Sequence, residues 1–329
     1  MVPVYEIRAG KVEAMNRRDC IAGLGALLAA PLFPRVFTPD AMAEPGHVGN
    51  FRYIYSDPQL KREFLDFLTN VFHLYPEQEL HETLARLAMS RDTDRQVYEA
   101  LQTELEDLSP FLGALRYAIP ALRKQKKIMA SQTLMLVDRD ATYDGHLEIG
   151  STGRYVGILE DKLDITGDVF LLHTREAGYG PEDIVDRGQL AKIGTHIDMG
   201  NYSTEFANII PHNSLDMVTV FIGFHHCPLE TRQQFISAVR DVIRPGGVLI
   251  LRDHDCYNDD AWRMAALAHD TFNAGTDESW QYNTDELRNF YSIRFIIDLV
   301  EDTGFRNNNM LLFQPGDPTR NALTAFRKI

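Results

Sequence analysis

Cysteine is scarce in this sequence: its 329 residues include only Cys20, Cys227 and Cys256. A disulfide framework needs more cysteines than this, so the class of small, disulfide-stapled secreted domains is excluded. Cys227 and Cys256 can meet as one bridge or stay as two thiols, and the sequence leaves both open.

Basic residues are also in deficit, with 33 Lys and Arg against 47 Asp and Glu and a formal net charge of −14. Nucleic-acid grooves depend on clustered cations that contact phosphates, so this balance argues against a nucleic-acid partner. We interpret a local basic cluster on residues 123–127 as a solvated helix face. A small-molecule or protein substrate is therefore expected, while monomer and homodimer both stay open.

Long apolar runs are absent, and the uncharged segment 20–34 is shorter than the roughly 20 residues that span a bilayer, so no stable membrane span is expected. This segment follows Arg17 and Arg18 and precedes a small-x-small pattern at 41–43. Residues 1–45 thus resemble a twin-arginine export signal, which implies a periplasmic or exported protein. A frayed N-terminal helix with a chance arginine pair, in a cytoplasmic protein, is the alternative.

Residues 46–140 show helical periodicity, and we predict a helical cap domain there. Asp57 and Pro58 have the pattern of an N-cap followed by a first-turn proline. Apolar residues at three- and four-residue spacing predict further helices after Pro76, over 97–108, and from 111 to about 129 with a kink at Pro120. Residues 134–137 are predicted as a short strand or as the end of this unit.

Residues 141–329 change to short apolar strands alternating with helices, a pattern typical of a parallel sheet with helices on both faces. Ligands of such sheets bind at the carboxyl ends of the strands. The dinucleotide fingerprint G-x-G-x-x-G is missing at these strand ends, which disfavours a nicotinamide-dependent enzyme.

The first strand, at 146–149, leads into a glycine-containing loop, where a missing Cβ allows a ligand to approach the backbone. An acid before such a loop resembles the first motif of class I S-adenosylmethionine-dependent methyltransferases, although Thr152 and Arg154 stand where glycine is common. The resemblance implies that Glu148 orients the amino group of S-adenosyl-L-methionine. It further implies that the methionine part of this cofactor lies against Gly150, Ser151, Thr152 and Gly153.

The next two strands, at 168–173 and 195–199, carry the other cofactor positions that the resemblance implies. Glu176 is the acid nearest to the position that contacts the ribose hydroxyls. Asp198 and Met199 correspond to the segment that contacts adenine, with a turn-capping role as the alternative for Asp198. Gly223, after the fourth strand, is the last of the residues that the resemblance implies contact the cofactor.

The most specific pattern covers about 40 residues, from 213 to 253. It reads as a loop, a buried strand, a polar turn, a helix over 231–243, a Pro-Gly-Gly turn at 245–247 and a second buried strand. It closely resembles the fourth and fifth strands of the same family, and the runs 309–314 and 323–327 resemble its closing hairpin. The family resemblance implies a doubly wound, Rossmann-like α/β fold with a seven-stranded sheet and an antiparallel last strand.

Polar residues follow both of these strands: His225, His226 and Cys227 after the fourth, Asp253 and His254 after the fifth. Because the two strands are neighbours in this fold, their ends can face one cleft. A neutral histidine can accept a proton from a nucleophile, so His225, His254 and Asp253 are the candidate catalytic residues. Histidines that merely pack the cofactor loop, and a metal site without a recognisable motif, are the alternatives.

A long insertion at 254–283, rich in aromatic residues, is predicted to form a substrate lid. We expect a helix over 261–272 within it and a second helix opened by Asn283 and Glu286 and running to Val300. The expected function is methyl transfer from S-adenosyl-L-methionine to an O, N or C nucleophile of a small molecule. A non-catalytic exported binding protein and a metal-dependent enzyme, both on this fold, are the alternatives.

Overall fold

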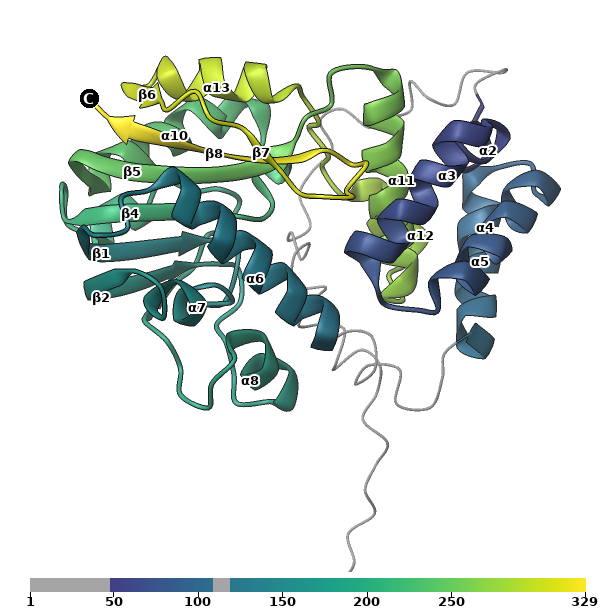
Figure 1. The fold of residues 1–329 in the computed structure, drawn as a ribbon, viewed down its shortest axis with the longest axis horizontal. Coiled ribbons are helices and arrows are strands. Elements are labelled where there is room, and N and C mark those ends of the chain that lie inside the picture. Colours follow the sequence, from purple (N-terminus) through teal and green to yellow (C-terminus); the bar gives the residue numbers. More distant parts are fainter. Residues whose placement is uncertain (1–47, 109–118) are drawn as a thin grey trace, which may run out of the picture.

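The computed structural model describes residues 48–108 and 119–329, and Figure 1 shows a sheet flanked by helices beside a separate helical group. The export-signal-like segment 1–45 lies outside the described residues. Within the described part, no helix is both long enough and apolar enough to cross a bilayer.

One eight-stranded sheet has the strand order β3-β2-β1-β4-β5-β8-β6, and β7 pairs with β8. The strands β1 to β5 are parallel, whereas β8 runs antiparallel to β5 and to β6. This confirms the predicted doubly wound fold with an antiparallel last strand, and the short β7 raises the number of strands above the predicted seven. The strands are β1 Thr142–Ile149, β2 Asp164–Leu172, β3 Thr195–Ile197, β4 Leu215–Val220, β5 Ile243–His254, β6 Phe305–Asn307, β7 Leu312–Phe313 and β8 Asn321–Lys328.

Both faces of the sheet are covered, as the apolar strand sequences require. Successive residues of a strand point to opposite faces. Val218 of β4 therefore packs in a core with Val239 of α10 and Ile296 of α13, while Met217 packs in another core with Met129 of α6. The helices of this part are α6 Ile119–Leu136, α7 Val156–Glu160, α8 Pro181–Arg187, α9 Phe206–Ile209, the 3-10 turn η4 Phe224–His226, α10 Leu229–Val242 and α13 Ile293–Glu301.

The helical group has its own core, which also includes Met264, Leu267 and Ala268 of α11. Asp57 caps α3 as predicted, because its Oδ1 accepts hydrogen bonds from the backbone N–H groups of Gln59 (2.7 Å) and Leu60 (2.9 Å). The helices are α2 Asn50–Ser56, α3 Pro58–Phe67, the π-helical turn η2 Leu68–Phe72, α4 Glu77–Ser90, α5 Asp94–Leu108, α11 Asp259–Gly275 and α12 Trp280–Asp285.

The structure decides two local predictions at the edges of the sheet. Residues 134–137 form no strand but are the end of a helix, the second of the two predicted possibilities, since α6 continues to Leu136 and buries Thr133 and Leu136 along its packed face. The prediction for the Pro-Gly-Gly segment is wrong. The Pro-Gly-Gly segment is no turn before the strand, because β5 begins at Ile243 and the register shifts between Ile243 and Val248. Gly246, with φ 80°, allows this bulge in the strand.

The predicted start of the helix that runs to Val300, at Asn283 and Glu286, is also wrong. Asn283 lies inside α12, and Glu286 is the residue that ends that helix. The later helix α13 begins at Ile293 and is capped by Ser292, whose side chain accepts a hydrogen bond from the N–H of Phe295. Asn283 and Glu286 do not cap the later helix, because their side chains bond to Asn273 and Arg288 in the interior.

Candidate functional site

The loop after β1 lies against the end of β4. Gly150 has φ 84°, and a Cβ on it would come within 2.5 Å of the carbonyl oxygen of Ile222. Its N–H donates to the carbonyl of Leu172 at 3.0 Å, which ties the loop to the end of β2. Only glycine fits this backbone crossing without strain.

Glu148, in β1 directly before that loop, is buried, with 1% of its surface exposed. Its carboxyl group accepts hydrogen bonds from the hydroxyl of Ser151 and, at 3.2 Å, from the N–H of Tyr155. The Ser151 oxygen in turn accepts from the N–H groups of Gly153 (3.2 Å) and Arg154 (3.1 Å). Burial raises the pKa of Glu148 to about 7.

Arg154 of this loop forms a buried ion pair. The Nε of Arg154 lies 2.6 Å from Oδ1 of Asp186 on α8, and both side chains are 3% exposed. Thr152 donates its hydroxyl hydrogen to Oδ2 of the same carboxylate at 3.2 Å. The ion pair and this hydrogen bond link the loop to α8.

The other predicted cofactor residues are spread over the ends of β2, β3 and β4. Glu176 is on the surface and pairs with Lys192 at 2.8 Å, and Asp198 is also exposed, accepting from the N–H of Gly200 at 2.9 Å. Met199 is buried in the core of the sheet. Gly223 has φ 85° and directly precedes η4, the turn that carries His225 and His226.

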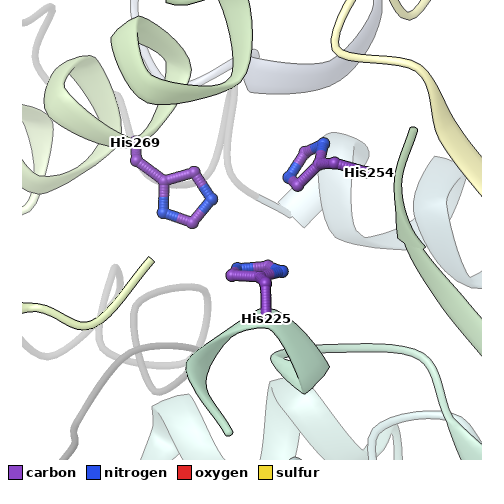
Figure 2. A group of neighbouring side chains, drawn as sticks. All are labelled: His225, His254 and His269. Carbon is purple, nitrogen blue, oxygen red and sulfur yellow. The ribbon is translucent and has the colours of Figure 1, made fainter. Parts of the chain in front are cut away.

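Three histidines from separate segments face one another, as Figure 2 shows. His225 comes from η4, His254 from the end of β5 and His269 from α11. Their ring centroids are 5.3 Å (His225 to His254), 5.0 Å (His225 to His269) and 5.6 Å (His254 to His269) apart. The structure thus brings together the two histidines singled out in the sequence and adds a third from the insertion.

Each histidine that follows a strand has its Nδ1 held by an oxygen acceptor. For His225 this is Oδ1 of Asp253 at 2.7 Å, and for His254 it is the carbonyl of Thr319 at 2.8 Å. His226 likewise lies 2.6 Å from the carbonyl of Leu287. Since these oxygens accept, Nδ1 carries the proton and Nε2 keeps its lone pair.

Burial keeps the imidazoles of the cluster neutral. It is the largest cause that lowers the pKa of His225 and of His254, and for His225 the neighbouring histidines add to it. Burial also lowers the pKa of His269 to about 3. Neutral imidazoles with free lone pairs can accept a proton or bind a metal ion.

A polar network behind His269 escaped prediction from the sequence. Arg288 donates to Oδ1 of Asp270 (2.7 Å), to Oε2 of Glu286 (2.7 Å) and to the side-chain oxygen of Asn283 (2.6 Å). Nδ1 of His269 lies 3.6 Å from Oε2 of Glu286. The signal in the sequence was a set of charged and amide residues on otherwise buried turns, which can be recognised only once α11 is known to be internal.

The two cysteines within the described residues are both free thiols. Sγ of Cys227 faces the carbonyl of Pro228 and Sγ of Cys256 that of Ala261, so the open question of a bridge is answered against pairing. Burial raises the pKa of Cys227 to about 12. The potential ligand groups in the described part of the chain consist of histidine and glutamate, without cysteine.

No protein-family profile matches the chain. It is 25% identical over 164 residues to the ubiquinone/menaquinone biosynthesis C-methyltransferase UbiE of Roseobacter denitrificans, a match that covers 43% of this chain and 63% of the relative. The chain therefore spans less than two thirds of the relative's length.

Among solved structures, the chain is similar to the 1,6-didemethyltoxoflavin-N1-methyltransferase of Burkholderia thailandensis, with 11% identity, 73% and 92% of the two chains covered and a TM-score of 0.42. It is also similar to a SAM-dependent methyltransferase from Aquifex aeolicus, with 15% identity, 69% and 98% covered and a TM-score of 0.40. These scores are low, and the fold assignment rests on the strand order of the chain itself.

Proposed function

We propose that this protein is an S-adenosylmethionine-dependent methyltransferase that acts on an O, N or C nucleophile of a small molecule. The observation that carries the proposal is the strand order, in which five parallel strands are followed by β8, antiparallel between β5 and β6. That arrangement is distinctive of the family which the motifs resemble. The sequence similarity to a C-methyltransferase supports the same activity.

The methyl donor S-adenosyl-L-methionine is assigned to the carboxyl ends of the strands, where ligands of such sheets bind. Its methionine part would lie on the loop that Glu148 organises, against Gly150, Ser151, Thr152 and Gly153. Its adenine would lie between Asp198 and Met199 after β3 and Gly223 after β4. Glu176 would have to release Lys192 to reach the ribose, so its assignment requires that the surface ion pair opens.

The histidine cluster is assigned to the acceptor side of the reaction. Nε2 of His225 is buried without a hydrogen-bond partner among the described residues, while Asp253 fixes the ring through Nδ1. The acceptor atom forms a bond to the methyl carbon as the bond to sulfur breaks, the electron pair goes to sulfur, and the acceptor's proton leaves to a base. His225 offers the lone pair for this proton, and His254 is the second candidate.

A non-catalytic role on the same fold is the second candidate function. The buried pair of Arg154 and Asp186 and the internally bonded Glu148 already satisfy much of the loop that a methyl donor would contact. A protein that kept the fold and lost the donor would show this kind of internal pairing.

Thermal unfolding of the full chain with S-adenosylhomocysteine separates the two functions. We expect stabilisation of about 2.7 kcal/mol at a free ligand concentration of about 100 times Kd, and none with a nicotinamide dinucleotide. Gly150→Ala should abolish the response, since its Cβ would strike the carbonyl of Ile222 at 2.5 Å. Gly157→Ala is the matched control, because nothing lies within 4 Å of its Cβ.

An unchanged melting temperature at saturating S-adenosylhomocysteine would contradict the proposed donor and favour the non-catalytic protein. Stabilisation that persists in Gly150→Ala at the level of Gly157→Ala would place the nucleotide away from this loop.

A further inference from the structure

We propose that His225, His254 and His269 form a binding site for one zinc ion, and that zinc binding and the proposed base role of His225 exclude each other. One nitrogen of each imidazole lies within 4.8 Å of the nitrogens of the other two. The three rings come from η4, from the end of β5 and from α11, and they face a common centre (Figure 2).

The orientation of the rings supports ligation through Nε2. Asp253 and the carbonyl of Thr319 hold Nδ1 of His225 and His254 at 2.7 and 2.8 Å, which leaves both Nε2 lone pairs available. Nδ1 of His269 lies 3.6 Å from Oε2 of Glu286, beyond hydrogen-bond distance, and has no hydrogen-bond partner among the described residues. The acceptors behind His225 and His254 are the arrangement that fixes tautomer and ring angle in protein zinc sites.

The cluster is buried, and a bound cation would compensate for its lack of hydrogen-bond partners. The three histidines are between 7% and 9% exposed, and Nε2 of His225 has no hydrogen-bond partner among the described residues. A buried polar atom left unpaired costs about 1–3 kcal/mol, so the lone pair on Nε2 of His225 is unfavourable without a ligand. An ion bound between the three rings would give it one.

The chemistry of the donors selects the metal. Neutral imidazoles suit zinc and its neighbours in the transition series, whereas magnesium and calcium prefer oxygen. At zinc–nitrogen distances of about 2.0–2.1 Å, ligand nitrogens lie roughly 3.4 Å apart, so nitrogens that lie within 4.8 Å of one another have to approach by at most about 1.4 Å. Three histidines leave a fourth position for water or for a substrate atom, as in catalytic zinc sites.

A second potential ligand group, His226, His269 and Glu286, lies beside the first. Oε2 of Glu286 is already engaged by Arg288 at 2.7 Å and by Asn273 at 3.1 Å. We therefore assign Glu286 to the support of His269. An ion on Nε2 of His225 uses the same lone pair as a proton would, so zinc binding replaces the role of His225 as a base.

The test is zinc titration of the full chain after dialysis against a chelator, followed by calorimetry and by X-ray absorption of the zinc-loaded protein. We expect about one zinc per chain with about three imidazole ligands. His254→Asn and His269→Asn should abolish the site, and Asp253→Asn should weaken it roughly 10- to 100-fold by loosening His225. His212→Asn, at an exposed histidine, and His81→Asn, at a buried histidine of the helical group, are the controls.

Absence of stoichiometric binding, or binding equally strong in His254→Asn and His269→Asn, would overturn the proposal. If these variants fail to fold, the absorption spectrum of the wild-type protein still decides, because a shell dominated by oxygen or sulfur contradicts three imidazoles. Binding of S-adenosylhomocysteine is measured separately on the zinc-free chain. Failure of the donor site and failure of the metal site are therefore distinguishable.

Discussion

Glu148 stabilises the loop after β1, in addition to the ligand contact that the resemblance implies. The resemblance assigned it to the amino group of the methyl donor, yet its carboxyl group accepts hydrogen bonds from Ser151 and Tyr155 in the protein interior. Because these partners come from the loop itself, Glu148 sets the loop's conformation. The sequence could place an acid before the loop but could not show which way it turns.

The raised pKa of Glu148 gives a pH dependence of stability. Between about pH 4.5 and about pH 7 the folded chain retains a proton that the unfolded chain releases, so the free energy of unfolding should fall by roughly 3 kcal/mol as the pH rises. Glu148→Gln carries no titrating group and should lose this dependence.

Chemical denaturation at several pH values checks this expectation. Relative to wild type, Glu148→Gln should be more stable at about pH 8 than at about pH 5, while Glu79→Gln, exposed on α4, should follow wild type throughout. Parallel pH profiles for wild type and Glu148→Gln would show that Glu148 titrates as it does in the unfolded chain.

His269 could not be assigned from the sequence, because one histidine in an aromatic-rich helix carries no spacing signal. His225 and His254 were accessible, since each directly follows a buried strand and the two strands are neighbours in the sheet. The difference is physical: strand ends are brought together by sheet topology, whereas the approach of α11 depends on tertiary packing.

Helices and strands with strong local signals were predicted well, and those held by distant partners were not. Asp57 and Pro58 define the start of α3 through contacts within a few residues. Asn283 and Glu286 have similar capping chemistry, yet both bond to Asn273 and Arg288 in the interior. A capping pattern therefore predicts a helix start only when no buried cation competes for the same side chains.

Arg288 is expected to hold α11, α12 and the following loop together. It is 13% exposed in its side chain and pairs with Asp270 and Glu286, whose side chains are 6% and 1% exposed. Arg288→Met would leave two buried carboxylates without their cation and should cost about 3–5 kcal/mol in urea unfolding.

An exposed arginine provides the comparison for this change. Arg294 pairs with Asp298 on the surface of α13, with side chains 73% and 52% exposed. Arg294→Met should alter the free energy of unfolding by less than about 1 kcal/mol. Equal, small effects of the two substitutions would mean that the buried network does not stabilise this region.

At the scale of the whole molecule, α11 connects the two parts: it shares a core with α2 to α5, and its His269 lies beside His225 and His254 at the strand ends. The sequence predicted helical residues before the sheet and an insertion after β5. It could not predict that the insertion completes the helical core, because the apolar stripe of α11 is compatible with many partners. The family resemblance, in contrast, was sufficient for the sheet, since the rules for connecting parallel strands leave only a few possible strand orders.

The central claim, that the methyl donor lies across the ends of β1, β3 and β4, is tested most directly by photo-cross-linking the full chain to radiolabelled S-adenosyl-L-methionine and mapping the labelled peptides. The account predicts label within 148–155, 198–200 or 221–226, removed by competing S-adenosylhomocysteine. Label confined to α2 to α5, or label that the competitor does not remove, would contradict it.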